Sequence, residues 1–306
     1  MRGSGKDRHS MAFLKDLELL WQTPKLLRGK GPADFYEWLG DDVVEGESSG
    51  FKDPNKVLWL NLGYWETART YREAAEAMGA ELADAAQLNA NDTLLDVGFG
   101  FAEQDFMWVD RYAVKRIVGL NITPMHVDRA RERVQERGLS DRIDLRLGSA
   151  TDMPFEPNTF DKITALECAF HFDPRDKFFS EAFRVLRPGG RLAAADGIPA
   201  PGHSAPSWVQ RLALKRWSVP LVNFYDRDEY VRRLQAVGFV NVQCRSIRQF
   251  VFPGNAKYRR ARHAGGSVTE TRIELSQDEI ARVAGIEDWE PTGLTDYAIF
   301  SADKPR

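Results

Sequence analysis

The sequence has 306 residues, of which 43% are hydrophobic and 28% charged, so it can bury a substantial core and favours one decorated α/β domain. Its formal net charge of −3 excludes the basic surface that neutralises nucleic-acid phosphates, and its 2 cysteines exclude a disulfide framework or a four-cysteine zinc site. No apolar run approaches the roughly 20 residues of a membrane-spanning helix, so we expect a cytoplasmic protein without a membrane span.

The N-terminal region divides into three parts. Residues 1–10 are polar and precede a second methionine, Met11, and we expect them to be an expression tag. Apolar residues at helical spacing predict one or two short amphipathic helices over residues 11–38. The acidic, turn-rich residues 41–56 indicate a mobile lid, so that 11–60 forms a unit of N-terminal helices and lid.

Strand and helix patterns alternate after an expected helix at residues 71–88. Strands are predicted at 93–97, 116–120, 143–147, 160–166 and 191–195, the last after a turn at 188–190. Helices are predicted after Gly100 and at 124–137 and 177–186. Such alternation predicts right-handed crossovers and a mostly parallel sheet with helices on both faces. A ligand then belongs at the carboxyl ends of the strands.

The C-terminal part carries two further features. Residues 197–228, rich in proline and containing an expected helix at 208–217, are interpreted as an inserted cap over the ligand site. Residues 229–306 are expected to complete the core with a helix at 228–237 and strands at 239–244 and 295–304, around a further insertion.

Three successive strand ends carry ligand-binding signals. The turn Asp96–Gly100 contains two glycines that allow close backbone approach, although alone it is equally typical of an ordinary strand-to-helix turn. The next strand ends at Asn121, whose polar side chain can meet ribose hydroxyls, and the third is followed by GSATDMPF, which contains Asp152. One nucleoside-type ligand can therefore contact all three ends.

These motifs together resemble the class I S-adenosylmethionine (SAM)-dependent methyltransferases. LLDVGFG, IVGLN, GSATDMPF, FDKITALECAFHF and VLRPGGRLA occur in that family's order, over residues 61–196. NLGYW and FDPRDKFFSEAFRVLRPGG resemble the macrolide sugar O-methyltransferases of the erythromycin pathway, and Glu-x-x-x-His is shared with sterol and isoprenoid C-methyltransferases. The resemblance implies a Rossmann-like fold with a seven-stranded sheet, 61–196 as the SAM-binding core, and S-adenosylhomocysteine as product.

The resemblance also implies a cofactor site. Its expected residues are Tyr64, Asp96, Gly98, Gly100, Gln104, Asn121, Ala150, Thr151, Asp152 and Glu167. Asn121 stands where many relatives carry an acidic residue, so ribose binding would use an amide that both donates and accepts. The alternatives are a turn residue at Asn121 and a packed aromatic pair at Tyr64 and Trp65.

The expected catalytic residues are His171, Glu167 and Asp196. A histidine can accept the proton that leaves a methylated hydroxyl, and the matching histidine of rebeccamycin-type relatives has that role. Asp196 is expected to orient His171 or the substrate, while Glu167 either positions a hydroxyl or stabilises the cation of C-methylation. The alternatives are a core or capping role for His171 and hydrogen-bonded structural carboxylates.

The remaining histidines, Cys168 and the aromatic residues have narrower expected roles. The catalytic trio is chemically able to hold a divalent metal, but the motif needs none and we expect none. Cys168 is interpreted as a packed side chain and His126, His203 and His263 as surface residues. The expected substrate-binding residues are Trp65, Trp208, Trp217, Phe224 and Tyr225, with a plain core role as the alternative.

The sequence thus predicts an O-methyltransferase for a small, largely apolar natural product. C-methylation of an isoprenoid or its diphosphate is the alternative, in which Arg211, Lys215 and Arg216 can meet an anionic acceptor. A third hypothesis is a non-catalytic or cyclase-like protein that keeps the fold. The sequence leaves the acceptor open and does not decide between a monomer and a homo-oligomer.

Overall fold

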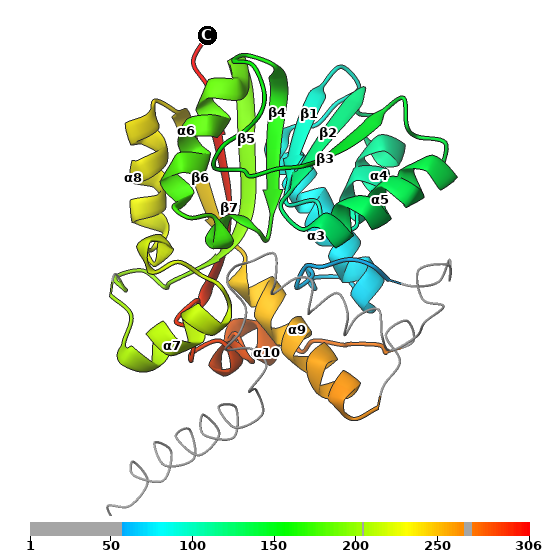
Figure 1. The fold of residues 1–306 in the computed structure, drawn as a ribbon. Helices are drawn as coiled ribbons and strands as arrows, with labels where there is room; N and C mark the ends of the chain where they lie inside the picture. The colour runs from blue at the N-terminus through cyan, green and yellow to red at the C-terminus, as the bar shows by residue number, and fades with distance from the viewer. Residues whose placement is uncertain (1–56, 204, 266–270) are drawn as a thin grey trace, which may run out of the picture.

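The computed structural model describes residues 57–203, 205–265 and 271–306. The expected tag, the N-terminal helices and the lid up to residue 56 lie outside these residues. Within them, no helix is both long and apolar enough to cross a bilayer. Figure 1 shows one sheet with helices on both faces, and a group of further helices beyond one end of the strands.

The sheet has seven strands in the order β3-β2-β1-β4-β5-β7-β6. The strands are β1 (Thr93–Val97), β2 (Arg116–Asn121), β3 (Ile143–Leu147), β4 (Phe160–Leu166), β5 (Leu186–Ile198), β6 (Val240–Ser246) and β7 (Asp296–Asp303). β1 to β5 pair in parallel, and β7 is inserted antiparallel between β5 and β6. The order confirms the predicted fold, and it reverses direction between β1 and β4, where open α/β sheets bind ligands.

Alternating side chains along each strand supply two hydrophobic cores. Leu94 of β1 joins the core that contains residues of α3 (Tyr71–Ala86), α4 (Glu103–Arg111) and α5 (Pro124–Glu136). Its neighbour Leu95 joins the core that contains α6 (Arg175–Val185) and α8 (Arg227–Val237). Successive strand residues point to opposite faces, so two adjacent leucines bury a helix layer on each side.

The turn predicted at residues 188–190 is instead part of a longer strand. β5 begins at Leu186, which pairs with Phe160, while the next pair joins Lys162 to Arg191. The extra residues of β5 are accommodated as an irregularity of the parallel ladder, which lets Gly189 adopt a φ of 79°. The strand is therefore continuous across a sequence that is typical of a turn.

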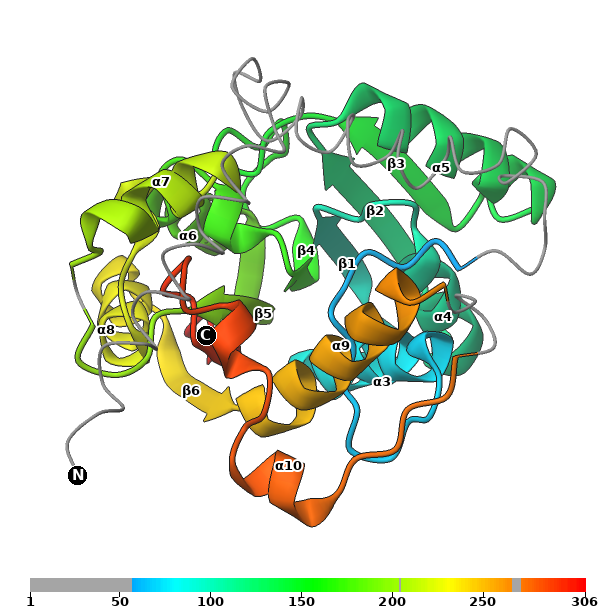
Figure 2. The same cartoon turned by 90° about the horizontal axis from the view of Figure 1, so that it is seen from below.

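Three helices lie around the carboxyl ends of the strands: α7 (Trp208–Arg216), α9 (Arg248–His263) and α10 (Gln277–Ala281) (Figures 1 and 2). The sequence predicted α7 but not α9, which contains Pro253 followed by Gly254. Gly254 is required by close packing, because a Cβ atom there would lie 2.1 Å from Cγ of Trp65. The pair Pro253–Gly254 therefore lies inside a helix and not in a turn, and its glycine leaves room for a buried tryptophan.

A buried ion pair fixes the end of β5 to the start of α6. Arg175 Nη2 lies 3.3 Å from Oδ2 of Asp196, and the two side chains are 1% and 0% exposed. The guanidinium is enclosed by the rings of Tyr225 and Tyr230, with its carbon 4.8 and 4.9 Å from their centroids. Removing one partner of such a pair leaves an uncompensated buried charge.

We expect Asp196→Ala to lower the free energy of unfolding by about 3–5 kcal/mol, because Arg175 then stays buried without its counter-charge. Asp278→Ala is the matched control, since Asp278 pairs with Arg282 at 80% and 72% exposure, and an exposed pair contributes at most about 1 kcal/mol. Urea denaturation followed by tryptophan fluorescence measures both. Equal losses in the two variants would contradict the role given to the buried pair.

Candidate functional site

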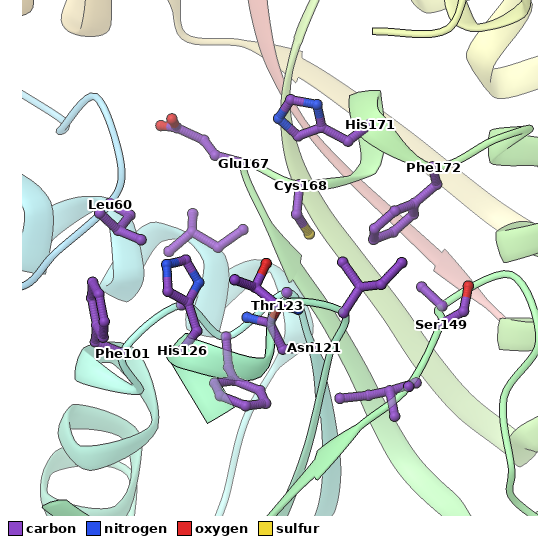
Figure 3. Close-up of a pocket in the computed structure, with 18 of the residues that line it drawn as sticks. Leu60, Phe101, Asn121, Thr123, His126, Ser149, Glu167, Cys168, His171 and Phe172 are labelled. Carbon is purple, nitrogen blue, oxygen red and sulfur yellow. The ribbon is translucent and has the colours of Figure 1, made fainter. Parts of the chain in front are cut away.

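A cavity of about 280 Å³ lies at the carboxyl ends of β1, β2, β3 and β4. Segments that are far apart in the sequence line it together (Figure 3). The lining residues include Leu58, Leu60, Asn61, Gly98–Phe101, Gln104, Leu120–Thr123, His126, Gly148–Thr151, Leu166–Cys168 and His171–Asp173. The cavity is therefore at the edge of the sheet where the sequence placed the ligand.

The turn after β1 is built around two glycines with left-handed backbone. Gly98 has a φ of 75° and Gly100 a φ of 56°, which cost glycine little and other residues more. A Cβ atom on Gly98 would also lie 2.6 Å from both Cβ and Sγ of Cys168. The Cys168 thiol donates to the carbonyl of Val97 at 3.1 Å, and burial raises the pKa of this thiol, as expected for a packed side chain.

The Asp96 side chain stabilises this turn through hydrogen bonds and does not line the cavity. Its carboxylate accepts hydrogen bonds from Thr164 Oγ1 at 2.7 Å and from Gln104 Nε2 at 3.0 Å. Gln104, which does line the cavity, also donates to the Phe99 carbonyl inside the turn. Burial raises the pKa of Asp96 to about 7, and burial beside Asp96 raises the pKa of Asp105.

The ends of β2 and β3 supply polar groups to the other side of the cavity. Asn121 is buried, and its Oδ1 accepts a hydrogen bond from the Thr123 amide at 3.0 Å. Its Nδ2 is then the group available to a ligand. Ala150 and Thr151 line the cavity, whereas the neighbouring Asp152 is exposed and does not line it.

The sequence predicted His126 at the surface, and this prediction is wrong. Its side chain is buried, lines the cavity and packs against Phe101, with ring centroids 4.5 Å apart. Burial lowers the pKa of His126 to about 4, so the imidazole is neutral. The signal was present: His126, Ala130 and Val134 are spaced four residues apart on one helix face. His203, in contrast, is exposed as expected, and the side chain of His263 lies outside the described residues.

Glu167 follows β4 and lines the cavity with a strained backbone, at a φ of 51°. Its Oε1 accepts hydrogen bonds from the Leu62 amide and from the Tyr297 hydroxyl, both at 2.7 Å. Burial raises the pKa of Glu167 to about 7, while these two donors oppose the rise. The carboxyl is therefore balanced between its two protonation states near neutral pH.

His171 lies in the short helix η2 (Ala169–His171), and its ring also lines the cavity (Figure 3). Nδ1 is 3.1 Å from the carbonyl oxygen of Ser218. A carbonyl can only accept, so Nδ1 carries the proton and Nε2 carries the lone pair in the neutral ring. Burial lowers the pKa of His171 to about 4, which keeps the ring neutral at physiological pH.

Asp196 does not line the cavity with the other two expected catalytic residues. Its Oδ1 accepts a hydrogen bond from the Phe170 amide at 3.2 Å, and its other oxygen faces Arg175. It acts on the segment that carries His171 rather than on the ring itself. Among the described residues, no group of three or more His, Cys, Asp or Glu side chains is arranged to hold a metal ion.

The aromatic residues expected to bind substrate do not line this cavity, and neither does Tyr64. Trp65 is fully buried and donates to the Leu62 carbonyl at 2.8 Å, so it anchors the segment before α3. Phe224 and Tyr225 are buried in packing, and Trp217 lies against Trp289. Trp208 is 70% exposed on α7.

Comparison with known proteins agrees with this geometry. Residues 95–194 match a family model described as a methyltransferase domain. The chain is 37% identical to erythromycin 3''-O-methyltransferase of Saccharopolyspora erythraea over 281 residues, which cover 88% of this chain and 89% of that protein. It is 30% identical to 27-O-demethylrifamycin SV methyltransferase of Amycolatopsis mediterranei, with 68% and 77% covered.

Solved structures share the fold at lower identity. The [4+2]-cyclase SpnF has a TM-score of 0.64 and 23% identity, with 87% of this chain and 94% of that chain covered. Geranyl diphosphate C-methyltransferase from Streptomyces coelicolor A3(2), solved with S-adenosyl-L-homocysteine, has a TM-score of 0.60 and 21% identity, with 76% and 81% covered.

The strand order, the two-glycine turn beside the cavity and the similarity over most of the chain lead to one conclusion. This protein belongs to the class I SAM-dependent methyltransferases.

Proposed function

We propose that this enzyme methylates a hydroxyl group of a small natural product and that His171 accepts the hydroxyl proton. The position of His171 carries the proposal: its Nδ1 donates to the Ser218 carbonyl, so Nε2 carries the lone pair that can accept a proton, in a ring that lines the cavity. Two relatives, erythromycin 3''-O-methyltransferase and 27-O-demethylrifamycin SV methyltransferase, support the choice of a hydroxyl.

The cofactor fits the strand ends as follows. Gly98 and Gly100 line the cavity, and their lack of side chains lets the backbone approach the methionyl part of SAM closely. Asn121 is placed to meet the ribose, and Ala150 and Thr151 to border the adenine. His126 and Phe101 extend the same wall of the cavity. Asp96 and Gln104 act by holding the turn.

The low pKa of His171 suits this role. Bound SAM supplies the methyl group, which the acceptor oxygen takes as the carbon–sulfur bond breaks and its electron pair stays on sulfur. The acceptor oxygen becomes strongly acidic as it gains the methyl group, so even an imidazole with a pKa of about 4 can take the proton. Because burial keeps His171 neutral, the ring adds no positive charge beside the sulfonium. Its main contribution is proton removal, and alignment in the cavity supplies much of the rest.

C-methylation is the second candidate, and the placement of Glu167 favours it. Its carboxyl lines the cavity without a cationic partner of its own in the described chain, so an ionised Glu167 can stabilise a carbocation there. A third hypothesis, a non-catalytic or cyclase-like protein, predicts no S-adenosylhomocysteine from any acceptor in a broad panel of macrolides, glycosides and isoprenoids.

We expect Gly98→Ala to abolish measurable binding of S-adenosylhomocysteine, because the new methyl group would overlap Cys168 and strain the backbone. Isothermal titration calorimetry measures the affinity. Gly138→Ala is the matched control, since Gly138 also has a positive φ, 65°, but a Cβ atom there meets nothing within 4 Å. Equal affinity in both variants would overturn the cofactor placement.

We expect His171→Ala to lower kcat by about 10²- to 10⁴-fold, the usual contribution of a general base. Binding of S-adenosylhomocysteine should stay unchanged, and the exposed His203→Ala should keep full activity. Turnover is followed as S-adenosylhomocysteine release with an acceptor found in the panel. Unchanged turnover in His171→Ala would remove the base assignment.

We expect Glu167→Gln to lower C-methylation far more than O-methylation, because the amide cannot stabilise a carbocation. The product made with ¹³C-methyl-labelled SAM identifies the bond, since methyl groups on oxygen and on carbon differ widely in ¹³C chemical shift. A methyl group bonded to carbon in the wild-type product would decide for the second candidate.

A further inference from the structure

Tyr297 contacts the cavity-lining Glu167 from strand β7. It lies on β7, where it pairs with Gly197 of β5, and its side chain is 1% exposed. Its hydroxyl lies at the carboxyl end of β4 and donates to Oε1 of Glu167 at 2.7 Å. Burying a tyrosine hydroxyl is costly unless it finds a partner, and Glu167 supplies that partner.

The same carboxylate oxygen receives a second donor from a different part of the chain. The amide of Leu62 donates to Oε1 at 2.7 Å, and the preceding residues Leu58, Leu60 and Asn61 line the cavity. No described residue donates to the other oxygen, Oε2. Oε1 therefore joins three segments, and Oε2 is the oxygen left for a ligand.

We propose that Tyr297 is a positioning residue: with the Leu62 amide it occupies Oε1 of Glu167, fixes the carboxylate in one orientation and reserves Oε2 for a hydroxyl of the acceptor other than the one whose proton His171 takes. The inference rests on the proposed function, because it takes the acceptor to bind in the cavity that Glu167 lines. A carboxylate held by two donors on one oxygen has lost the rotation that a single donor would allow.

Several ionisable groups act on Glu167 and determine how it titrates. The groups that face it are Asp196 on β5, Tyr71 on α3, Tyr297 on β7 and the adjacent Cys168. Burial and Asp196 favour the protonated carboxyl, whereas the Leu62 amide and the Tyr297 hydroxyl favour the carboxylate. Loss of the Tyr297 hydroxyl therefore raises the pKa of Glu167 above its value of about 7 and turns an acceptor into a donor at neutral pH.

The test measures the titration of Glu167 directly in Tyr297→Phe. Carboxyl ¹³C NMR of glutamate-labelled enzyme follows it, with the Glu167→Gln spectrum identifying the signal. We expect the titration midpoint to rise by about one pH unit, and the acid limb of kcat to move the same way. Tyr112→Phe is the matched control, because the Tyr112 hydroxyl also donates to a carboxylate, that of Asp84, at 3.2 Å, but Tyr112 follows the end of α4 and does not line the cavity.

A second variant keeps the test independent of folding. Site-specific replacement of Tyr297 by 3-fluorotyrosine preserves the ring but makes a stronger donor, so the midpoint of Glu167 should fall. A midpoint that is the same in wild type, Tyr297→Phe and the fluorotyrosine enzyme would overturn the positioning role. If the midpoints move as expected while no acceptor is methylated, the proposed function fails and the hydrogen-bond arrangement stands.

Discussion

The arrangement of the site depends on one buried carboxylate, Asp96, at the end of β1. It is fully enclosed and is held by Thr164 from the neighbouring strand and by Gln104 from the helix that follows the turn. Strand, turn and helix are thereby fixed to each other at the point where the sheet changes winding direction. The two glycines between strand and helix adopt left-handed backbone at little cost because they lack a Cβ atom.

Burial shifts the pKa values of His171 and Glu167, the two ionisable groups that the proposed chemistry uses, in opposite directions. The same loss of solvent lowers the pKa of His171 and raises that of Glu167, because in each case the charged form is disfavoured. A cavity that receives a sulfonium thus contains a neutral imidazole and a carboxyl close to its titration midpoint. None of the described residues that line the cavity carries a fixed positive charge, and the Glu167 carboxyl, with its pKa near 7, can respond to what is bound.

Sequence patterns predicted the sheet and much of the cavity, because both depend on local signals. Period-two strands gave the bounds of β1, β3 and β4, and ordered motifs brought Gly98, Asn121 and Glu167 to one cavity. Contacts between distant residues leave no such signal, so the Arg175–Asp196 pair and the antiparallel insertion of β7 were not anticipated. α9 was missed because its proline and glycine are typical of turns, and the expected substrate aromatics proved to lie in packing or on the surface.

The contact between Gly254 and Trp65 joins α9 to the loop that precedes α3. Trp65 is seated on α9, and both its indole nitrogen and the Asn255 amide donate to the carbonyl of Leu62, whose own amide meets Glu167. Packing and hydrogen bonds thus connect α9, the loop at Leu62 and the Glu167 carboxylate in one series of contacts. A displacement of Trp65 against α9 would therefore reach Glu167 through the backbone of Leu62.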